Sequence, residues 1–298
     1  MELFTPFGLS RMSEVMMSVI HASVPSAPYT RLPRFTAEIA EPIEAASWAL
    51  CDTGVRQHAV RDYQQQGYAV VQVHGSASTT SDLFTLAKAL NLGAPFTPPV
   101  YKNSPHTSGG VSDISARKDG AHPFEGSRGQ DLHCDGTLQH LGEVPTTILL
   151  CSAPAAEGGV TYLVNLVDAY TALLRTDPEA AEQLAHDGAL KRTSGSHSVI
   201  GPAFTEQQPG HLMSRYSRTV TDRYYALPGR QGALKRALAF MDAAARPGSA
   251  FRTEVVLDSG QALIFANDQM GHGRTAYLDA PSRPRLLRRG LFTTRPCA

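Results

Sequence analysis

The sequence predicts a mainly β protein with flanking helices, an α+β arrangement whose core is a double-sheet jelly roll. Several short apolar or alternating segments are typical of strands, and Gly- and Pro-containing turns separate them. The helical patterns occur in groups instead of alternating regularly with strands, which disfavours a parallel α/β sheet. At 298 residues the chain is long enough for one large β domain that does not divide further.

Two helices are expected in the first third of the chain. Residues 55–66 have a polar amphipathic pattern that ends at Gly67, a residue typical of helix ends. Residues 82–92 have a second helical pattern, which Ser81 can cap and Gly93 can end.

Two further helical stretches are expected to cover one side of the molecule. One spans residues 168–186, with a break at Asp177 and Pro178, and the other spans residues 230–245. The strands are expected between and around these helices, at residues 68–73, 146–151, 160–166, 211–217, 251–257, 261–266 and 287–294.

Two segments, residues 1–30 and 101–130, have neither a helical nor a strand pattern. Residues 1–30 lack a charged start and an unbroken apolar stretch, so they predict neither a signal peptide nor a membrane span. Their Pro and Ser content favours a mobile or peripheral lead-in, after which residues 31–298 form a single domain. Residues 101–130 are polar and rich in Gly and Ser, which indicates a lid or a disordered insertion, and we favour the lid.

Composition excludes several classes of protein. The 27 basic and 27 acidic residues balance, and no basic stripe occurs, which argues against nucleic acid or an anionic membrane as a partner. The four cysteines are too few and too scattered for a disulfide framework or a Cys-x-x-Cys zinc site. A reducing cytoplasm is therefore the expected compartment, and a small molecule is the expected partner. The sequence predicts no oligomeric state.

Three residues in a fixed order predict a metal site. His133 and Asp135 are two positions apart, so in a strand or the turn leaving it both side chains point to the same side. His272 follows the apolar strand predicted at residues 261–266, and we expect it at a strand end. Two imidazoles and one carboxylate bind iron(II) on one face and leave three coordination positions open for chemistry.

Three further motifs accompany these ligands: Gly271-His-Gly-Arg-Thr275, Arg285-Leu-Leu-Arg-Arg289 and Glu157-Gly-Gly-Val-Thr161. With them, residues 52–294 resemble the Fe(II)- and 2-oxoglutarate-dependent dioxygenases of the TauD/TfdA group, nearer to the clavaminate-synthase-like branch. The resemblance implies a cupin-like double-stranded β-helix, with Fe(II) as the metal and 2-oxoglutarate and O2 as co-substrates. By the same resemblance, Asp135 disfavours a halogenase, because related halogenases carry a small residue in place of this carboxylate.

The resemblance assigns the outer carboxylate of 2-oxoglutarate to Arg285, with Thr161 as a neutral helper. A buried carboxylate needs such a partner, and a guanidinium supplies two parallel hydrogen bonds that Lys cannot reproduce. Arg283 and Arg288 are nearby rivals for this role. Strand alternation places Arg285, Leu287 and Arg289 on one face and turns Arg288 outward.

The expected activity is hydroxylation of an unactivated C–H bond in a small polar substrate, with release of succinate and CO2. An amino acid or amino-acid-derived natural product of specialised metabolism is the favoured substrate, and a sulfonate or other small anion is the alternative. Desaturation or cyclisation needs the same ligands and stays open. Arg289 is expected either to contact substrate or to form a structural ion pair, and weaker substrate contacts are expected at Ser112, Asp113, Arg117 and Asp222.

Two readings from other classes stay open. One is a jelly-roll binding protein without turnover, and the other is a zinc hydrolase, since zinc accepts the same donors. Thr161 and Arg285 discriminate against the hydrolase, because neither has a role there, whereas a dicarboxylate co-substrate needs both.

Overall fold

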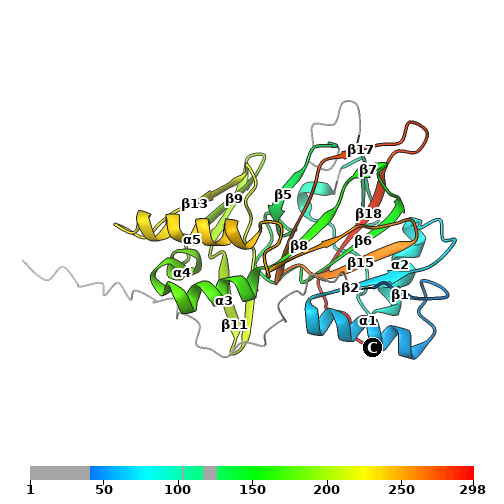
Figure 1. Ribbon diagram of the computed structural model, residues 1–298, viewed down its shortest axis with the longest axis horizontal. Coiled ribbons are helices and arrows are strands. Elements are labelled where there is room, and N and C mark those ends of the chain that lie inside the picture. Colours follow the sequence, from blue (N-terminus) through cyan, green and yellow to red (C-terminus); the bar gives the residue numbers. More distant parts are fainter. Residues whose placement is uncertain (1–40, 103, 117–125) are drawn as a thin grey trace, which may run out of the picture.

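The computed structural model describes residues 41–102, 104–116 and 126–298, which form a β-sandwich with a helical lobe at its side (Figure 1). The predicted lead-in at residues 1–30 and Arg117 lie outside the described residues. The larger sheet of the sandwich has seven strands in the order β1-β2-β15-β6-β18-β4-β3. These are β1 (Ile43–Glu44), β2 (Tyr68–Gln72), β15 (Gln261–Ala266), β6 (Thr146–Ala153), β18 (Leu286–Phe292), β4 (Val111–Ile114) and β3 (Thr107–Ser108).

The smaller sheet carries the motifs singled out in the sequence. Its order is β14-β8-β16-β5, with β14 (Arg252–Val255), β8 (Thr161–Asn165), β16 (Met270–Arg274) and β5 (Gln130–His133). Side chains of the two sheets meet between them, where the rings of Phe265 on β15 and His272 on β16 are 4.9 Å apart. The short strands β7 (Glu157–Gly158) and β17 (Tyr277–Leu278) pair at the edge. This mainly β, jelly-roll architecture is the one expected from the sequence.

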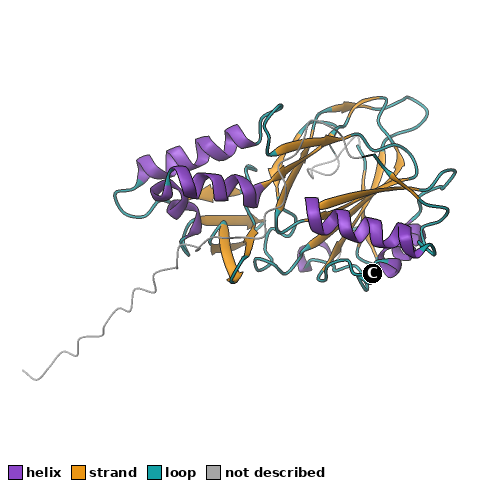
Figure 2. Ribbon diagram, turned by 60° about the horizontal axis from the view of Figure 1, so that its bottom comes forward, coloured by secondary structure: helices purple, strands orange, loops and turns teal. Residues whose placement is uncertain are grey.

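The first two helices cover the larger sheet (Figure 2). Helix α1 (Thr53–Gln66) ends at Gly67 as expected, because that glycine adopts a left-handed conformation with φ of 85°. Helix α2 (Thr80–Ala89) begins earlier than expected. Its cap is Thr79, whose side chain exchanges hydrogen bonds with Asp82 in a capping box, so the assignment of the cap to Ser81 was wrong.

A separate lobe holds the other helices. The predicted break at Pro178 is confirmed, since α3 (Leu166–Thr176) ends there and α4 (Pro178–Ala185) begins. Helix α5 (Gln231–Ala244) packs on both. The lobe also contains five strands, of which only β12 matches an expected strand: β9 (Leu190–Ser194), β10 (His197–Gly201), β11 (Phe204–Gln208), β12 (His211–Ser214) and β13 (Asp222–Tyr224).

Part of the segment at residues 101–130, for which a lid was predicted, belongs to the sandwich, and residues 103 and 117–125 lie outside the described residues. The segment follows a 3-10 turn, η1 (Pro99–Tyr101), and contains β4, which pairs with β18 inside the larger sheet. This part is a strand of the sandwich and was missed because its pattern is polar and short. Residues 126–129, by contrast, form a loop before β5.

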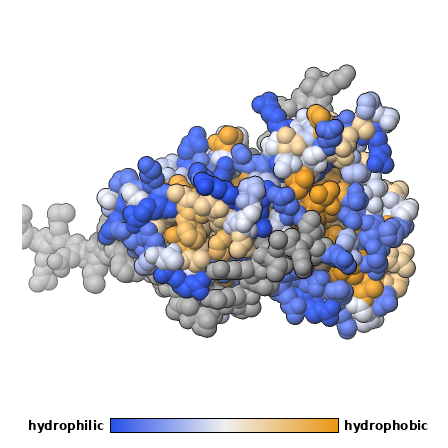
Figure 3. Space-filling view, viewed as in Figure 1, coloured by the Kyte–Doolittle hydropathy of each residue, from blue (hydrophilic) through white to orange (hydrophobic). Residues whose placement is uncertain are grey.

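The surface has no single dominant character. On the face shown in Figure 3, apolar side chains gather in patches over both lobes, with hydrophilic side chains around them. Within the described residues, the search for a helix long and apolar enough to cross a membrane finds none. The four cysteines are free thiols.

Candidate metal centre and active site

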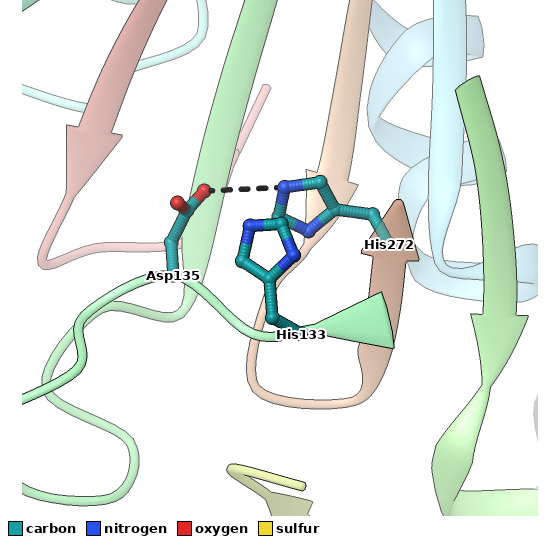
Figure 4. A group of neighbouring side chains, drawn as sticks. All are labelled: His133, Asp135 and His272. Atoms are coloured by element: carbon teal, nitrogen blue, oxygen red, sulfur yellow. Dashed lines mark ion pairs between the residues drawn. The ribbon is translucent and has the colours of Figure 1, made fainter. Parts of the chain in front are cut away.

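The structure brings His133, Asp135 and His272 together between the two sheets (Figure 4). One potential ligand atom of each lies within 4.8 Å of those of the other two, and all three residues are buried. His133 ends β5, Asp135 follows it in the turn, and His272 lies in the middle of β16. The expectation that His272 lies at a strand end was therefore wrong, because residues 270–274 form a full strand between β8 and β5.

The protonation states suit a metal ligand set. Burial, followed by the nearby His133, lowers the pKa of His272 to about 3, and burial also lowers the pKa of His133. Burial alone would raise the pKa of Asp135, but Arg289 and the two imidazoles outweigh it and lower this pKa to about 2. Near neutral pH the cluster therefore offers two neutral imidazoles and a carboxylate.

Asp135 is held through its carboxylate by two strands and through its backbone by the residue that follows a third. Arg289 on β18 donates to Oδ1 at 2.5 Å, and Thr147 on β6 donates to Oδ2 at 3.0 Å. Asn267, just after β15, accepts from the Asp135 backbone N–H at 2.7 Å and donates to its carbonyl at 3.2 Å. Such surrounding hydrogen bonds fix the orientation of a metal ligand.

A tyrosine ties the strands of the two histidines together. His133 and His272 are direct partners across β5 and β16. Tyr162 on β8 reaches over β16 and donates to the Gln130 carbonyl on β5 at 3.2 Å. It passes over Gly273, where a Cβ atom would lie 2.1 Å from the Tyr162 hydroxyl, so this position requires glycine. The Nδ1 atom of His133 lies 2.8 Å from the Asp131 carbonyl, which leaves Nε2 for the metal.

A small cavity lies on the His272 side of the cluster and has a volume of about 20 Å³. We call it the small cavity; its lining consists of Ile114, Gln130, Leu149, Thr161, His272, Gly273, Arg274, Arg285, Leu287 and Arg289. It has room for one end of a small ligand, such as a carboxylate group. The predicted common face of Arg285, Leu287 and Arg289 is therefore observed. Arg288 points to the opposite face, where it donates to the Ser78 carbonyl at 2.6 Å.

Arg285 is prepared for an anion that the described residues do not supply. Only 3% of the residue is exposed, and its Nη1 atom has no hydrogen-bond partner within the described chain. The Gly-Gly turn before Thr161 lies directly against the backbone at Ala276. A Cβ atom at Gly158, whose φ is 70°, would lie 2.2 Å from the Ala276 carbonyl oxygen, so this position requires glycine. A buried guanidinium with a free donor fits the outer carboxylate of 2-oxoglutarate.

A large cavity of about 550 Å³ lies on the side of His133 and Asp135. Its walls come from residues 126–137, from β9 and the turn after it, and from the segment at residues 219–221. Tyr101, Leu291 and Arg289 complete it, so Arg289 borders both cavities. We call this space the large cavity. Its size is that of a typical small-molecule site.

Of the described residues predicted to contact substrate, only Arg289 lines either cavity. Arg289 forms the buried ion pair with Asp135 described above. Ser112 lies beside Arg289 in the register of β4 and bonds Thr107, and Asp113 points the other way, 3.7 Å from Arg288. Asp222 is buried against Arg192 at 3.3 Å. Among the described residues, neither cavity is lined by Ser112, Asp113 or Asp222.

Sequence reasoning missed Asn267, Thr147, Tyr162 and Arg192. Asn267 had one available signal, a polar residue directly after a buried strand. Thr147 is 12 residues from Asp135, and Tyr162 and Arg192 lie farther along the chain, but no spacing in the sequence connects any of them to the ligands.

The comparisons with known proteins agree with this geometry. The profile of the taurine catabolism dioxygenase TauD, TfdA family matches residues 28–291. Two relatives are named uridine-5'-phosphate dioxygenase. The one from Streptomyces sp is 36% identical over 77% of this chain and 86% of its own length, and the one from Amycolatopsis sp is 35% identical over 80% and 89%.

A solved structure of asparagine oxygenase with Fe(II), hydroxyasparagine and succinate shares the fold. Its TM-score is 0.64, with 15% identity, over 83% of this chain and 81% of that one. A jelly roll with a buried His-Asp-His cluster, a buried guanidinium with one free donor and a family match over nearly the whole chain lead to one conclusion: the chain belongs to the TauD/TfdA family of dioxygenases.

Proposed function

We propose that the protein is an Fe(II)- and 2-oxoglutarate-dependent dioxygenase that acts on a nucleoside 5'-monophosphate such as uridine-5'-phosphate. The observation that carries the substrate class is the large cavity beside the triad, which has room for a nucleotide and is bordered by Arg128 and Arg192. The names of the two relatives at 35–36% identity support the same class. The family supports the oxygenase chemistry.

Each residue around the triad has a proposed task. His133, Asp135 and His272 hold the metal on one face, as this donor set does for iron(II). When bound, iron and 2-oxoglutarate supply the oxidising power, and succinate and CO2 are the by-products. Arg285 and Thr161 hold the outer carboxylate of the co-substrate in the small cavity. Arg289 keeps Asp135 ionised and oriented, and the large cavity positions one C–H bond of the substrate near the metal.

The sequence alone favoured an amino acid as substrate. Solved structures with the same fold contain hydroxylated asparagine or arginine, but at 15–16% identity they speak for the fold only. The nucleotide is preferred because the relatives named for it are far more similar to this chain over most of its length.

A succinate-release assay tests the proposal. Purified protein with Fe(II), 2-oxoglutarate and O2 is given uridine-5'-phosphate, uridine, asparagine, arginine or taurine at equal concentration. We expect uridine-5'-phosphate to give the highest rate, with one succinate for each nucleotide consumed, as measured by mass spectrometry. A highest rate with an amino acid or taurine, without consumption of nucleotide, would contradict the substrate class and leave the oxygenase chemistry intact.

We also propose a reducing cytoplasm as the compartment, supported by the four free thiols. A small molecule is the proposed partner. The equal numbers of basic and acidic residues argue against nucleic acid as a partner.

A further inference from the structure

We propose that Arg192 binds the anionic group of the substrate, which in the function proposed above is the 5'-phosphate of the nucleotide. The proposal rests on that function for the identity of the ligand. It rests on the structure for the existence of an anion site.

The Arg192 side chain has one donor left over. Only 2% of the residue is exposed. Its Nε donates to Asp222 at 3.3 Å and its Nη2 donates to the Cys134 carbonyl at 3.1 Å. Its Nη1 is buried and has no hydrogen-bond partner within the described residues. A buried charged donor without a partner is costly, so the site is suited to a ligand that supplies an acceptor.

The charges around Arg192 do not balance locally. Asp222 shares its carboxylate, since Oδ2 accepts from the backbone N–H and the hydroxyl of Thr219 at 2.8 and 2.7 Å. A second buried guanidinium, Arg215, lies near enough for burial and the charge of Arg192 to lower its pKa to about 10. Arg215 forms no ion pair within the described chain, so two buried cations share one carboxylate. An anion bound here would restore neutrality.

The position of Arg192 separates this site from that of the co-substrate. Arg192 lies on β9 and borders the large cavity together with His133 and Asp135. The carbonyl that it contacts belongs to Cys134, the residue between these two ligands. Arg285 borders the small cavity on the other side. An anion at Arg192 therefore belongs to a molecule that occupies the large cavity beside the metal, as the substrate must.

A phosphate group fits this corner well. A guanidinium recognises phosphate through directed, charge-assisted hydrogen bonds. The neighbouring lining residues are Thr193, Ser194 and Gly195, whose small side chains leave room for a tetrahedral group. Asp222 acts here as a positioning residue, because its buried ion pair fixes the direction of the guanidinium.

The test compares uridine-5'-phosphate with uridine, which lacks the phosphate. The double variant Arg192→Met/Asp222→Asn removes both partners of the buried pair, so no unpaired carboxylate is left to unfold the protein. We expect its preference for the phosphorylated substrate, the ratio of kcat/KM for uridine-5'-phosphate to kcat/KM for uridine, to fall roughly 10- to 100-fold, mainly through a higher KM for uridine-5'-phosphate. Arg192→Lys keeps the charge without the directed donors, and we expect an intermediate loss.

The matched control is Arg252→Met/Glu254→Gln. It removes another largely buried arginine with its ion pair, 2.7 Å long, on β14 and away from both cavities. This variant should keep the wild-type preference. An unchanged preference in a folded Arg192 variant, with normal dissociation of 2-oxoglutarate, would overturn the proposal. A loss that appears in Arg128→Met instead would also overturn it, because Arg128 is the exposed arginine of the same cavity.

A second measurement separates this proposal from the proposed function. If the wild-type protein consumes no nucleotide, the proposed function fails, and inorganic phosphate becomes the probe of the anion site. We then expect phosphate to raise the Tm of the wild-type protein and of the Arg252 control, but not of the Arg192 variant. Equal shifts in all three proteins would refute the anion site itself.

Discussion

The two cavities beside the triad differ in size and in the elements that build them. The small cavity, of about 20 Å³, is built almost entirely from strands of the sandwich and ends at the free donor of Arg285. The large cavity, of about 550 Å³, is walled by loops and by strand β9 of the helical lobe. In the proposed function, the strands of the sandwich hold the co-substrate, and the loops and the helical lobe hold the substrate.

Loss of the metal should affect both cavities and give the largest effect. In Asp135→Ala the cluster loses its carboxylate, and Arg289 loses its partner. We expect at least about 100-fold weaker Fe(II) binding by anaerobic equilibrium dialysis, and no succinate above background. Asp113→Ala is the control, because Asp113 pairs with Arg288 on the far face of β18. Full turnover by Asp135→Ala would show that the triad is not the metal site.

Arg285→Met should disturb the small cavity alone. Because Arg285 has a buried donor there without a partner among the described residues, we expect 2-oxoglutarate binding to weaken by about 2–5 kcal/mol, measured from its KM. The preference for uridine-5'-phosphate over uridine should not change. The control is Arg288→Met, three residues further along the chain and facing away from both cavities. If the KM for 2-oxoglutarate rises in the control and stays normal in Arg285→Met, the co-substrate role belongs to Arg288.

Asn267→Ala should loosen the triad without removing a ligand. It deletes the acceptor of the Asp135 N–H and the donor to its carbonyl, so we expect Fe(II) binding to weaken roughly 10- to 100-fold. Asn165→Ala is a matched control, since this buried asparagine caps α3 through Asp168 and should reduce only the free energy of unfolding, by about 1 kcal/mol. Equal metal affinities in the two variants would contradict a positioning role for Asn267.

Thr161→Val should give the smallest effect. It removes one neutral hydroxyl from the small cavity, and we expect the KM for 2-oxoglutarate to rise roughly two- to tenfold. Thr253→Val on the adjacent strand β14 provides the comparison, because Thr253 is buried outside both cavities. A change in substrate preference without a change in this KM would assign Thr161 to the large cavity.

The sequence was informative about the sandwich and much less so about the lobe. His133, Asp135 and His272 could be grouped because a His-x-Asp pair followed by a distant His is a donor set for iron(II), and because a family resemblance fixed their order. The common face of Arg285 and Arg289 followed from strand alternation alone.

The large cavity could not be predicted in the same way. Arg192 lies in a strand with the pattern Leu-Lys-Arg-Thr-Ser, which has little apolar alternation, so neither the strand nor its inward arginine was recognised. Asp222 was singled out for the right region, yet its carboxylate supports an arginine instead of reaching the cavity. Long-range partners of this kind depend on tertiary packing, which local patterns do not encode.

Arg289 on β18 and Arg285, which directly precedes this strand, also set a length. Arg285 and Arg289 are four residues apart along one chain segment, which is roughly 13 Å in extended backbone. Arg289 contacts the Asp135 carboxylate, and Arg285 lines the small cavity. Because the backbone of one hydrogen-bonded strand sets this span, we do not expect it to adapt to its ligand. Keto diacids with one methylene more or fewer would place their far carboxylate out of register, and the backbone of a single strand would thus select the five-carbon acid from its homologues.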